Sequence, residues 1–207
     1  VGYDFNYDLS KTERISKETV DQGDYAVFGS LLWTPSDRLS IQPGLRYAYN
    51  TTFNTPLVPS INLKYDLNEY TKLRVSYAQG FRAPSIKELY LDFVDQNHMI
   101  FGNEDLIPEN SKNANLSLAW HTSFNHSKQS FKVEPSLFYN FIEDRIQLVK
   151  TGTSNREFTY QNISEYTTFG GKIDLRYSIH PDFTFNLGYS HLGYSNIWRN
   201  ENGDLPT

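Results

Sequence analysis

The fold is decided by the stretch RLSIQPGLRYAYN, which runs from Arg38 to Asn50. From Leu39 to Tyr49 every odd-numbered position is apolar or aromatic, whereas the even-numbered positions between them are polar or small. Successive side chains of a β-strand point to opposite faces of a sheet. The period of two therefore predicts a strand with one apolar face and one polar face.

The same alternation recurs along the chain at near-regular spacing. It predicts about nine long strands, at residues 1–9, 24–34, 38–50, 57–67, 72–82, 112–122, 129–141, 166–178 and 183–195. Prolines 43, 59 and 135 fall inside three of these strands. Because proline has no N–H to donate to a central ladder, we expect a β-bulge at each of them.

Strand length and composition favour a membrane wall over a soluble sandwich. The predicted strands have roughly 11 to 13 residues, whereas globular strands have about 5–6 and a tilted strand crosses a bilayer in about 9–11. The chain has 15 Tyr and 14 Phe but only 38% hydrophobic residues. A transmembrane barrel uses both classes, because it turns apolar residues to lipid and polar residues to a wet lumen. Several aromatic residues near strand ends suit interfacial girdles: Trp33, Tyr47, Tyr49, Tyr65, Trp120, Tyr177 and Tyr189.

The connections fall into two classes by length. If neighbouring strands are antiparallel, one end receives the short turns 35–37, 66–69, 123–128 and 180–182. The other end receives 10–23, 51–56, 83–111, 142–165 and the chain from 196 onward. Within 142–165, the segments 146–150 and 157–161 predict a hairpin that extends the wall outward. Short turns at one end and long loops at the other are typical of bacterial outer-membrane barrels, with the long loops outside the cell. We therefore expect an all-β, antiparallel transmembrane β-barrel segment in the outer membrane.

Several function classes are disfavoured. The net charge of -5 argues against a nucleic-acid partner. The absence of cysteine excludes a disulfide framework and thiolate-bound zinc. Hydrolase, metalloprotease, P-loop and dinucleotide-binding motifs are missing from the sequence. Alternating acids and bases in the strands favour ion-pair ladders over catalytic carboxylate pairs: Asp66, Glu134 and Asp174 with Lys64, Lys132, Lys172 and Arg176. We expect no enzymatic activity and no intrinsic cofactor.

Two short boxes carry a specific resemblance. Phe81-Arg82-Ala83-Pro84 ends a predicted strand, and Asn103-Glu104-Asp105-Leu106 precedes Pro108-Glu109 and the next strand. Here the chain resembles the TonB-dependent outer-membrane receptors. Those proteins carry a Phe/Tyr-Arg-Ala-Pro box, a long extracellular loop, and an Asn-Pro-Asp/Asn-Leu box that leads into Pro-Glu. The first box matches fully, whereas Glu104 stands where the family usually has proline.

The resemblance implies a receptor with a 22-stranded barrel closed by an N-terminal plug, which captures scarce nutrients and imports them with energy transmitted by TonB. Residues 1–207 would then be a partial barrel domain without the plug and the remaining strands. A first residue Val1 and a turn-like end at 202–207 agree with such a segment. The implied partners are outer-membrane lipid, the TonB complex through the absent N-terminal part, the receptor's own plug domain and an extracellular ligand-capturing protein.

The ligand is suggested by position. Haem receptors of this family place a histidine between the two boxes, and His98 lies there. A neutral imidazole can ligate haem iron, with Met99 or Tyr90 assisting, although His98 can equally be a solvent-exposed loop residue. Haem is therefore the first substrate hypothesis, before cobalamin or a ferric siderophore. Two rivals belong to other classes, namely a small outer-membrane barrel enzyme acting on lipids and a passive porin.

Three arginines, Arg46, Arg74 and Arg82, point to the lumen in the predicted register. They would contact the plug or attract an anionic ligand, or else pair with neighbouring acids in the ladders. We favour pairing.

Overall fold

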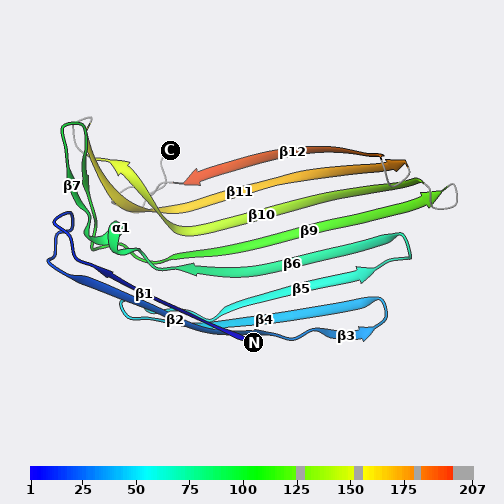
Figure 1. Cartoon of the computed structure of the whole chain (residues 1–207), viewed down its shortest axis with the longest axis horizontal. Coiled ribbons are helices and arrows are strands. Elements are labelled where there is room, and N and C mark those ends of the chain that lie inside the picture. The colour runs from blue at the N-terminus through cyan, green and yellow to red at the C-terminus, as the bar shows by residue number, and fades with distance from the viewer. Residues whose placement is uncertain (125–128, 152–155, 180–182, 198–207) are drawn as a thin grey trace.

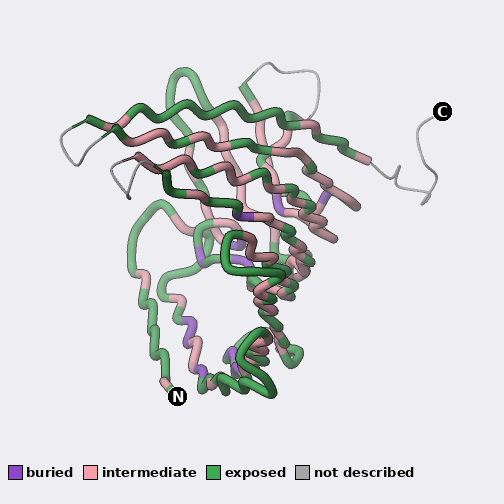
Figure 2. The backbone as a smooth tube through the Cα atoms, turned by 90° about the vertical axis from the view of Figure 1, so that its right-hand side faces the viewer, coloured by how far each residue is buried: buried purple, intermediate pink, exposed green. Residues whose placement is uncertain are grey.

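The computed structural model describes residues 1–124, 129–151, 156–179 and 183–197, and they form one 12-stranded sheet. The sheet order is β1-β2-β4-β5-β6-β9-β10-β11-β8-β7, with β12 also paired to β11 and β3 to β4 (Figure 1). Viewed along the strands, the sheet bends into a curved wall (Figure 2). The strands are β1 (Gly2–Ser10), β2 (Val20–Ser30), β3 (Trp33–Ser36), β4 (Leu39–Asn50), β5 (Val58–Asp66), β6 (Thr71–Arg82), β7 (Asp92–Val94), β8 (Met99–Phe101), β9 (Glu109–Phe124), β10 (Gln129–Lys150), β11 (Glu157–Ile179) and β12 (Phe183–Ile197).

The nine predicted long strands are confirmed as β1, β2, β4, β5, β6, β9, β10, β11 and β12. The predicted strand 24–34 was wrong in its bounds, because β2 covers Val20–Ser30 and a separate short strand, β3, follows. The hairpin predicted within 142–165 is confirmed, but it is continuous with the wall, so β10 and β11 reach 22 and 23 residues. Strands β7 and β8 were not predicted. Residues 125–128 and 180–182, which belong to two predicted turns, lie outside the described residues.

The in-strand prolines are accommodated by interrupted ladders, and the expected bulges were wrong. Pro43 lies opposite Leu31, in the gap between β2 and β3, where only the Leu31 N–H donates to the Pro43 carbonyl (3.1 Å) and the register is unchanged across the gap. Pro135 interrupts the ladder to β9 in the same way while it stays paired with Ile173 of β11. Pro59 precedes the ladder between β5 and β6. Each proline lacks its N–H toward one neighbour only, so the strand remains paired on its other side.

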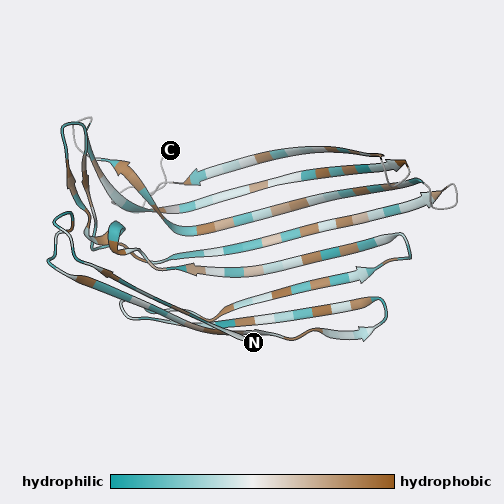
Figure 3. Ribbon diagram, viewed as in Figure 1, coloured by the Kyte–Doolittle hydropathy of each residue, from teal (hydrophilic) through white to brown (hydrophobic). Residues whose placement is uncertain are grey.

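The register gathers apolar side chains on one face of the sheet. Val75, Leu116 and Leu137 lie in line across β6, β9 and β10, and they are 37%, 42% and 59% exposed. Figure 3 shows the underlying alternation of hydrophobic and hydrophilic residues along the strands. A contiguous apolar face of this extent is not stable against water. It is the lipid-facing surface of a transmembrane wall, and the opposite, polar face is the lumenal one.

Aromatic rings concentrate near both ends of the strands on this face. At the turn end, the ring of Phe131 lies 6.1 Å from that of Trp120 and 6.4 Å from that of Tyr177, measured between centroids. At the loop end, Tyr25 stacks on Tyr49 at 6.3 Å. The two bands match the interfacial positions predicted for Tyr49, Trp120 and Tyr177, where an amphipathic ring contacts both lipid and water.

The described residues contain one helix, α1 (Ile86–Tyr90), in the connection between β6 and β9. Among these residues no helix has both the length and the apolar character needed to span a membrane.

Tight packing between β10, β11 and β12 requires a glycine at position 170. A Cβ added there would overlap the His191 carbonyl oxygen of β12 and approach Phe138 Cζ to 2.7 Å. We expect Gly170→Ala to lower the free energy of unfolding of the full-length receptor by about 1–3 kcal/mol, because a backbone neighbour cannot move aside. The matched control is Gly29→Ala, whose Cβ would lie no closer than 3.9 Å to Val1. Urea unfolding in detergent measures both, and equal midpoints would contradict the packing argument.

Candidate functional site

The connection between β6 and β9 rises above the loop end of the wall, together with the outer ends of β10 and β11 (Figure 1). It carries α1 and the β7–β8 hairpin, and β8 pairs in parallel with the start of β11. The two sequence boxes lie at its two roots, since Phe81 and Arg82 end β6 and Leu106 lies just before β9. The boxes are therefore placed where a long loop must be fixed to the barrel.

Arg82 joins the two roots. Its guanidinium Nη2 lies 2.6 Å from Glu109 Oε1 and its Nη1 lies 2.8 Å from Glu88 Oε2. Both carboxylate side chains are about 15% exposed, and Glu109 Oε1 also accepts the Ile146 N–H at 2.6 Å. Charge-assisted pairs with a planar guanidinium are the stronger class of hydrogen bond. The preference for Arg82 pairing with neighbouring acids is confirmed, and so is the same preference for Arg46, which pairs with Asp4 at 3.0 Å.

Helix α1 begins with a reciprocal cap that includes one of these carboxylates. Ser85 Oγ accepts the Glu88 N–H, and Glu88 Oε2 accepts the Ser85 N–H at 2.8 Å. Burial opposes ionisation of Glu88, but the hydrogen bonds from Arg82 and Ser85 outweigh it and lower the pKa of this carboxyl below its ordinary value. Glu88 is therefore an anion that connects Arg82 to the start of the helix.

The second box is held against β11. Asn103 Nδ2 donates to the Tyr160 carbonyl at 2.9 Å, and the Asn103 N–H donates to the Glu88 carbonyl at the same distance. Asn162 exchanges two hydrogen bonds with the backbone of Ile107, at 2.9 and 3.0 Å. The side-chain amides of Asn103 and Asn162 thus bond to backbone groups of segments that are not paired with them as neighbouring strands.

The apolar box residues are buried below the loop. Leu106 is 3% exposed and forms a cluster with Leu89 and Ile146. Pro84 is fully buried, and its carbonyl accepts a hydrogen bond from Gln22 Nε2 of β2 at 3.1 Å. The residues of the two boxes thus hold the loop to the wall, the first box at β6 and the second at β11. Together with their partners Glu88, Glu109 and Asn162 we call them the brace.

Glu104, which departs from the family pattern, contacts the loop between β1 and β2. Its Oε2 lies 2.6 Å from Lys17 Nζ, and this hydrogen bond raises the pKa of the Lys17 ammonium. The same ammonium lies 4.2 Å from the centre of the Tyr90 ring, and the Ser16 N–H donates to the Tyr90 carbonyl at 2.8 Å. A carboxylate in place of proline therefore ties two loops together.

The three residues suggested as haem ligands do not meet. His98 lies in the turn between β7 and β8, where its side chain is 55% exposed and its Nδ1 is 3.5 Å from Asp95 Oδ1. Met99 begins β8 beside it and donates its N–H to the Arg156 carbonyl. Tyr90 ends α1 at the opposite, root end of the hairpin and packs on the buried cluster. Their role as ligands stays a prediction, and Tyr90 lies away from the turn that holds His98 and Met99.

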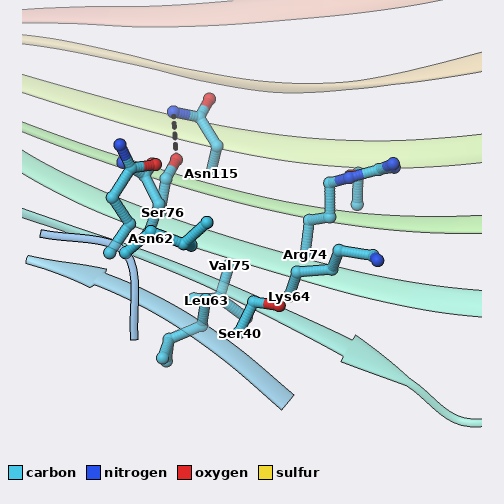
Figure 4. Close-up of a pocket in the computed structure, with 11 residues that line it drawn as sticks. Ser40, Asn62, Leu63, Lys64, Arg74, Val75, Ser76 and Asn115 are labelled. Atoms are coloured by element: carbon cyan, nitrogen blue, oxygen red, sulfur yellow. Dashed lines mark hydrogen bonds between the residues drawn. The ribbon is translucent and has the colours of Figure 1, made fainter. Parts of the chain in front are cut away.

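The polar face carries the predicted ion-pair ladders. Asp66 pairs with Lys64 at 3.1 Å, Asp174 pairs with Lys172 at 2.8 Å, and Glu134 contacts Lys132. Beside Lys64, a cavity of about 470 Å³ is lined by amides and hydroxyls from β4, β5, β6 and β9, by Lys64 and Arg74, and by Leu32, Leu63 and Val75. Figure 4 shows the Asn115 amide donating to Ser76 in this cavity, and Lys64 and Arg74 extending in one direction beside it. The lumenal wall therefore offers amide and hydroxyl groups in this region and charged groups toward the turn end.

Sequence reasoning did not find several residues that hold the loop. Glu109 had a signal, because it lies in the Pro-Glu pair that follows the second box. Lys17, Gln22 and Asn162 had none, since their partners lie 87, 62 and 55 residues away along the chain. Only the three-dimensional arrangement reveals such contacts.

Loss of Arg82 tests the brace. In Arg82→Gln the carboxylates of Glu88 and Glu109 remain largely buried without their cation, which is costly even after allowance for the 44% exposure of the arginine side chain. We expect the α1 amides and the Ile146 amide to exchange at least about tenfold faster, equivalent to about 1.4 kcal/mol. The matched control is Arg46→Gln, which breaks a single ion pair, with Asp4, whose carboxylate is more exposed than those of Glu88 and Glu109. Hydrogen exchange of both variants, measured in the full receptor, tests this expectation. Equal protection of the α1 and Ile146 amides in the two variants would argue against the brace.

Acid should loosen the same region. The pKa of Glu88 is lower in the folded state than its ordinary 4.5, so its contribution to stability is complete above pH 4.5 and is lost as the pH falls through the lower folded value. We expect the protection of the α1 amides from exchange to fall with that titration. In Glu88→Gln the protection should be weaker at neutral pH and should lack this acid step; a step unchanged in the variant would assign it to another group.

Comparison with known proteins gives the family. The TonB dependent receptor-like β-barrel family matches residues 1–207. The iron-regulated outer membrane virulence protein of Vibrio cholerae is 25% identical over 193 residues, which is 87% of this chain and 29% of that protein. The hemoglobin and hemoglobin-haptoglobin-binding protein A of Haemophilus influenzae is 34% identical over 102 residues, which is 49% of this chain and 8% of that protein. The chain thus spans less than a third of each of these relatives.

Solved structures show the same fold. The siderophore receptor PirA of Pseudomonas aeruginosa superposes with a TM-score of 0.74 at 18% identity, covering 95% of this chain and 36% of PirA. The hemophore receptor HasR of Serratia marcescens, in complex with its hemophore HasA and heme, superposes with a TM-score of 0.79 at 15% identity, covering 94% of this chain and 38% of HasR. With its two-faced wall, its loop end and the match over its full length, the chain belongs to the TonB dependent receptor-like β-barrel family of the bacterial outer membrane.

Proposed function

We propose that the receptor containing this chain captures an iron-bearing nutrient at the loop end of the barrel and imports it with TonB-derived energy, with haem as the first substrate. The observation that carries the proposal is the two-faced wall. Its loop end holds the long connection between β6 and β9, which is fixed at both of its roots. Several relatives support the choice of ligand, since their names describe hemoglobin binding or heme/hemopexin utilization. The plug and the contact with TonB belong to parts of the receptor outside residues 1–207.

We assign His98 as the residue that binds the metal ion of the imported ligand. Among the described residues no group of three or more His, Asp or Glu side chains is arranged for a free metal ion. Haem, in contrast, needs only one or two axial ligands from the protein. His98 Nδ1 lies 3.5 Å from Asp95 Oδ1, which leaves Nε2 as the nitrogen for the metal, as in sites where a carboxylate supports a metal-bound histidine.

Asp95 is suited to that supporting role. Its Oδ1 accepts the N–H groups of Asn97 and His98 at 2.7 and 2.6 Å, and these bonds lower the pKa of its carboxyl. The carboxylate stays ionised near neutral pH and orients the histidine ring. Met99, the next residue, is the second ligand candidate, and Tyr90 is the weakest because it is held at the root of the hairpin.

A ferric siderophore is the second candidate, favoured by the superposition on PirA, a siderophore receptor. HasR was captured with a hemophore, and an extracellular ligand-capturing protein is accordingly a proposed partner here. The family consists of transport receptors, so we propose that the chain catalyses no reaction and holds no intrinsic cofactor. Cobalamin stays a third candidate, from the sequence resemblance alone.

Haem titration of the full-length receptor in detergent, followed by the Soret band, tests this function. We expect saturable binding that weakens at least about tenfold in His98→Ala, because an axial bond is lost. His191→Ala is the matched control, since His191 lies on the lipid-facing side, opposite Gly171 of β11. Tyr90→Phe should bind like the wild type.

Two results would count against the haem assignment. Equal binding by wild type and His98→Ala would remove His98 from the site. Absence of saturable haem binding to the wild type, with a ferric siderophore bound instead, would replace haem by the second candidate.

A further inference from the structure

A second cavity, of about 390 Å³, lies toward the turn end of the lumenal face. Its lining includes Lys72, Arg74, Lys132 and Arg176, from β6, β10 and β11, together with His121 of β9. Arg74 also lines the larger cavity that Figure 4 shows, so the two hollows share this side chain. Four cationic side chains thus surround one recess in a chain whose net charge is negative.

The register brings like charges together here. Lys132 of β10 lies directly opposite Arg176 of β11. Lys64 lies directly opposite Arg74 between β5 and β6. Like charges in directly opposed positions destabilise a sheet. The arrangement therefore costs stability unless an anion is nearby.

The neighbouring carboxylates do not balance these cations. Asp66 faces Lys72 in the register but pairs with Lys64, and Asp174 pairs with Lys172. Glu134 is shared, since it contacts Lys132 and lies 3.9 Å from Arg74. Within the described ranges, Lys72 and Arg176 have no acidic partner. Six cations thus face three carboxylates, an excess of three positive charges.

Two other cations on this face have acidic partners. Arg46 lies 3.0 Å from Asp4, and near the loop end Arg82 lies 2.6 Å from Glu109 and 2.8 Å from Glu88. The excess is therefore local to the recess and is not a general property of the wall. A recess lined by one sign of charge, with low-dielectric walls, concentrates counter-ions.

We propose that this recess is a binding site for a multiply charged anion that presents carboxylate or phosphate groups to the lumen. Arg74 and Arg176 supply planar guanidinium forks that match such groups, and Lys72 and Lys132 add mobile point charges. The Arg74 and Lys132 side chains are each 49% exposed, so they can turn toward a ligand. The volume of the recess is within the range of small-molecule sites. The site rests on the barrel fold and on its charge pattern, and it holds whichever nutrient is imported.

Isothermal titration of the full-length receptor in uncharged detergent tests the proposal, with citrate as probe and inorganic phosphate in parallel. We expect saturable binding of at least one of them, weakened at least about tenfold in the double variant Lys72→Gln/Arg176→Gln and by added salt. Arg46→Gln is the matched control, a lumenal cation of β4 that does not line the recess, and should bind within about twofold of the wild type. The stronger probe identifies carboxylate or phosphate as the preferred group.

A substitution of opposite sign gives the sharper test. Glu134→Gln removes the only shared carboxylate and should tighten anion binding, which a general loss of structure cannot do. No saturable binding of either probe to the wild type, unchanged affinity in the folded double variant, or weaker binding in Glu134→Gln would each overturn the proposal. Because citrate and phosphate contain no iron, these results are independent of the haem titration.

Discussion

The structure depends on one constraint, which is that a strand in lipid must satisfy every backbone polar group through its neighbours. Once each strand is paired on both sides, the alternation of side chains leaves one face for lipid and one for the lumen, and a slip of one residue would exchange them. The in-strand prolines show how strictly the register is kept, since Pro43 and Pro135 omit a bond to one neighbour without shifting the ladder. Exposed apolar residues such as Leu137 are a consequence of the same pairing.

Beyond the lipid-facing strands, the chain changes from ladder pairing to side-chain bonding. The loop above β6 and β9 is held by Arg82 with two carboxylates, by Asn103 and Asn162 acting on backbone groups, and by a small buried cluster around Leu106. The family boxes therefore hold the loop in place. The His98 side chain, in the β7–β8 turn, takes no part in these contacts and is exposed. The residues that support the loop are thus different from His98, the proposed haem ligand, and the β7–β8 turn can vary without loss of that support.

The sequence allowed the wall to be predicted because its information is local. Alternation within residues 38–50, for example, is enough to define β4 and its faces. Bounds were wrong where tertiary pairing decides them, as in β10 and β11, which continue past the lipid-facing section because each pairs with the other. The contacts of Lys17 and Gln22 could not be predicted, since they join segments that only the folded sheet brings together. The charge excess in the lumen became visible only once the register placed Lys132 opposite Arg176.

The central claim is that adjacent residues of one strand face lipid and lumen in turn, and nitroxide accessibility in the full-length receptor tests it most directly. This chain has no cysteine, so spin labels at Ser136→Cys and Leu137→Cys would be the sole labels within it. In lipid vesicles we expect the label at 137 to be relaxed strongly by oxygen and weakly by a water-soluble nickel complex, and the label at 136 to be relaxed much less by oxygen. Equal oxygen accessibility at the two positions, or the reverse order, would contradict the two-faced wall on which the account rests.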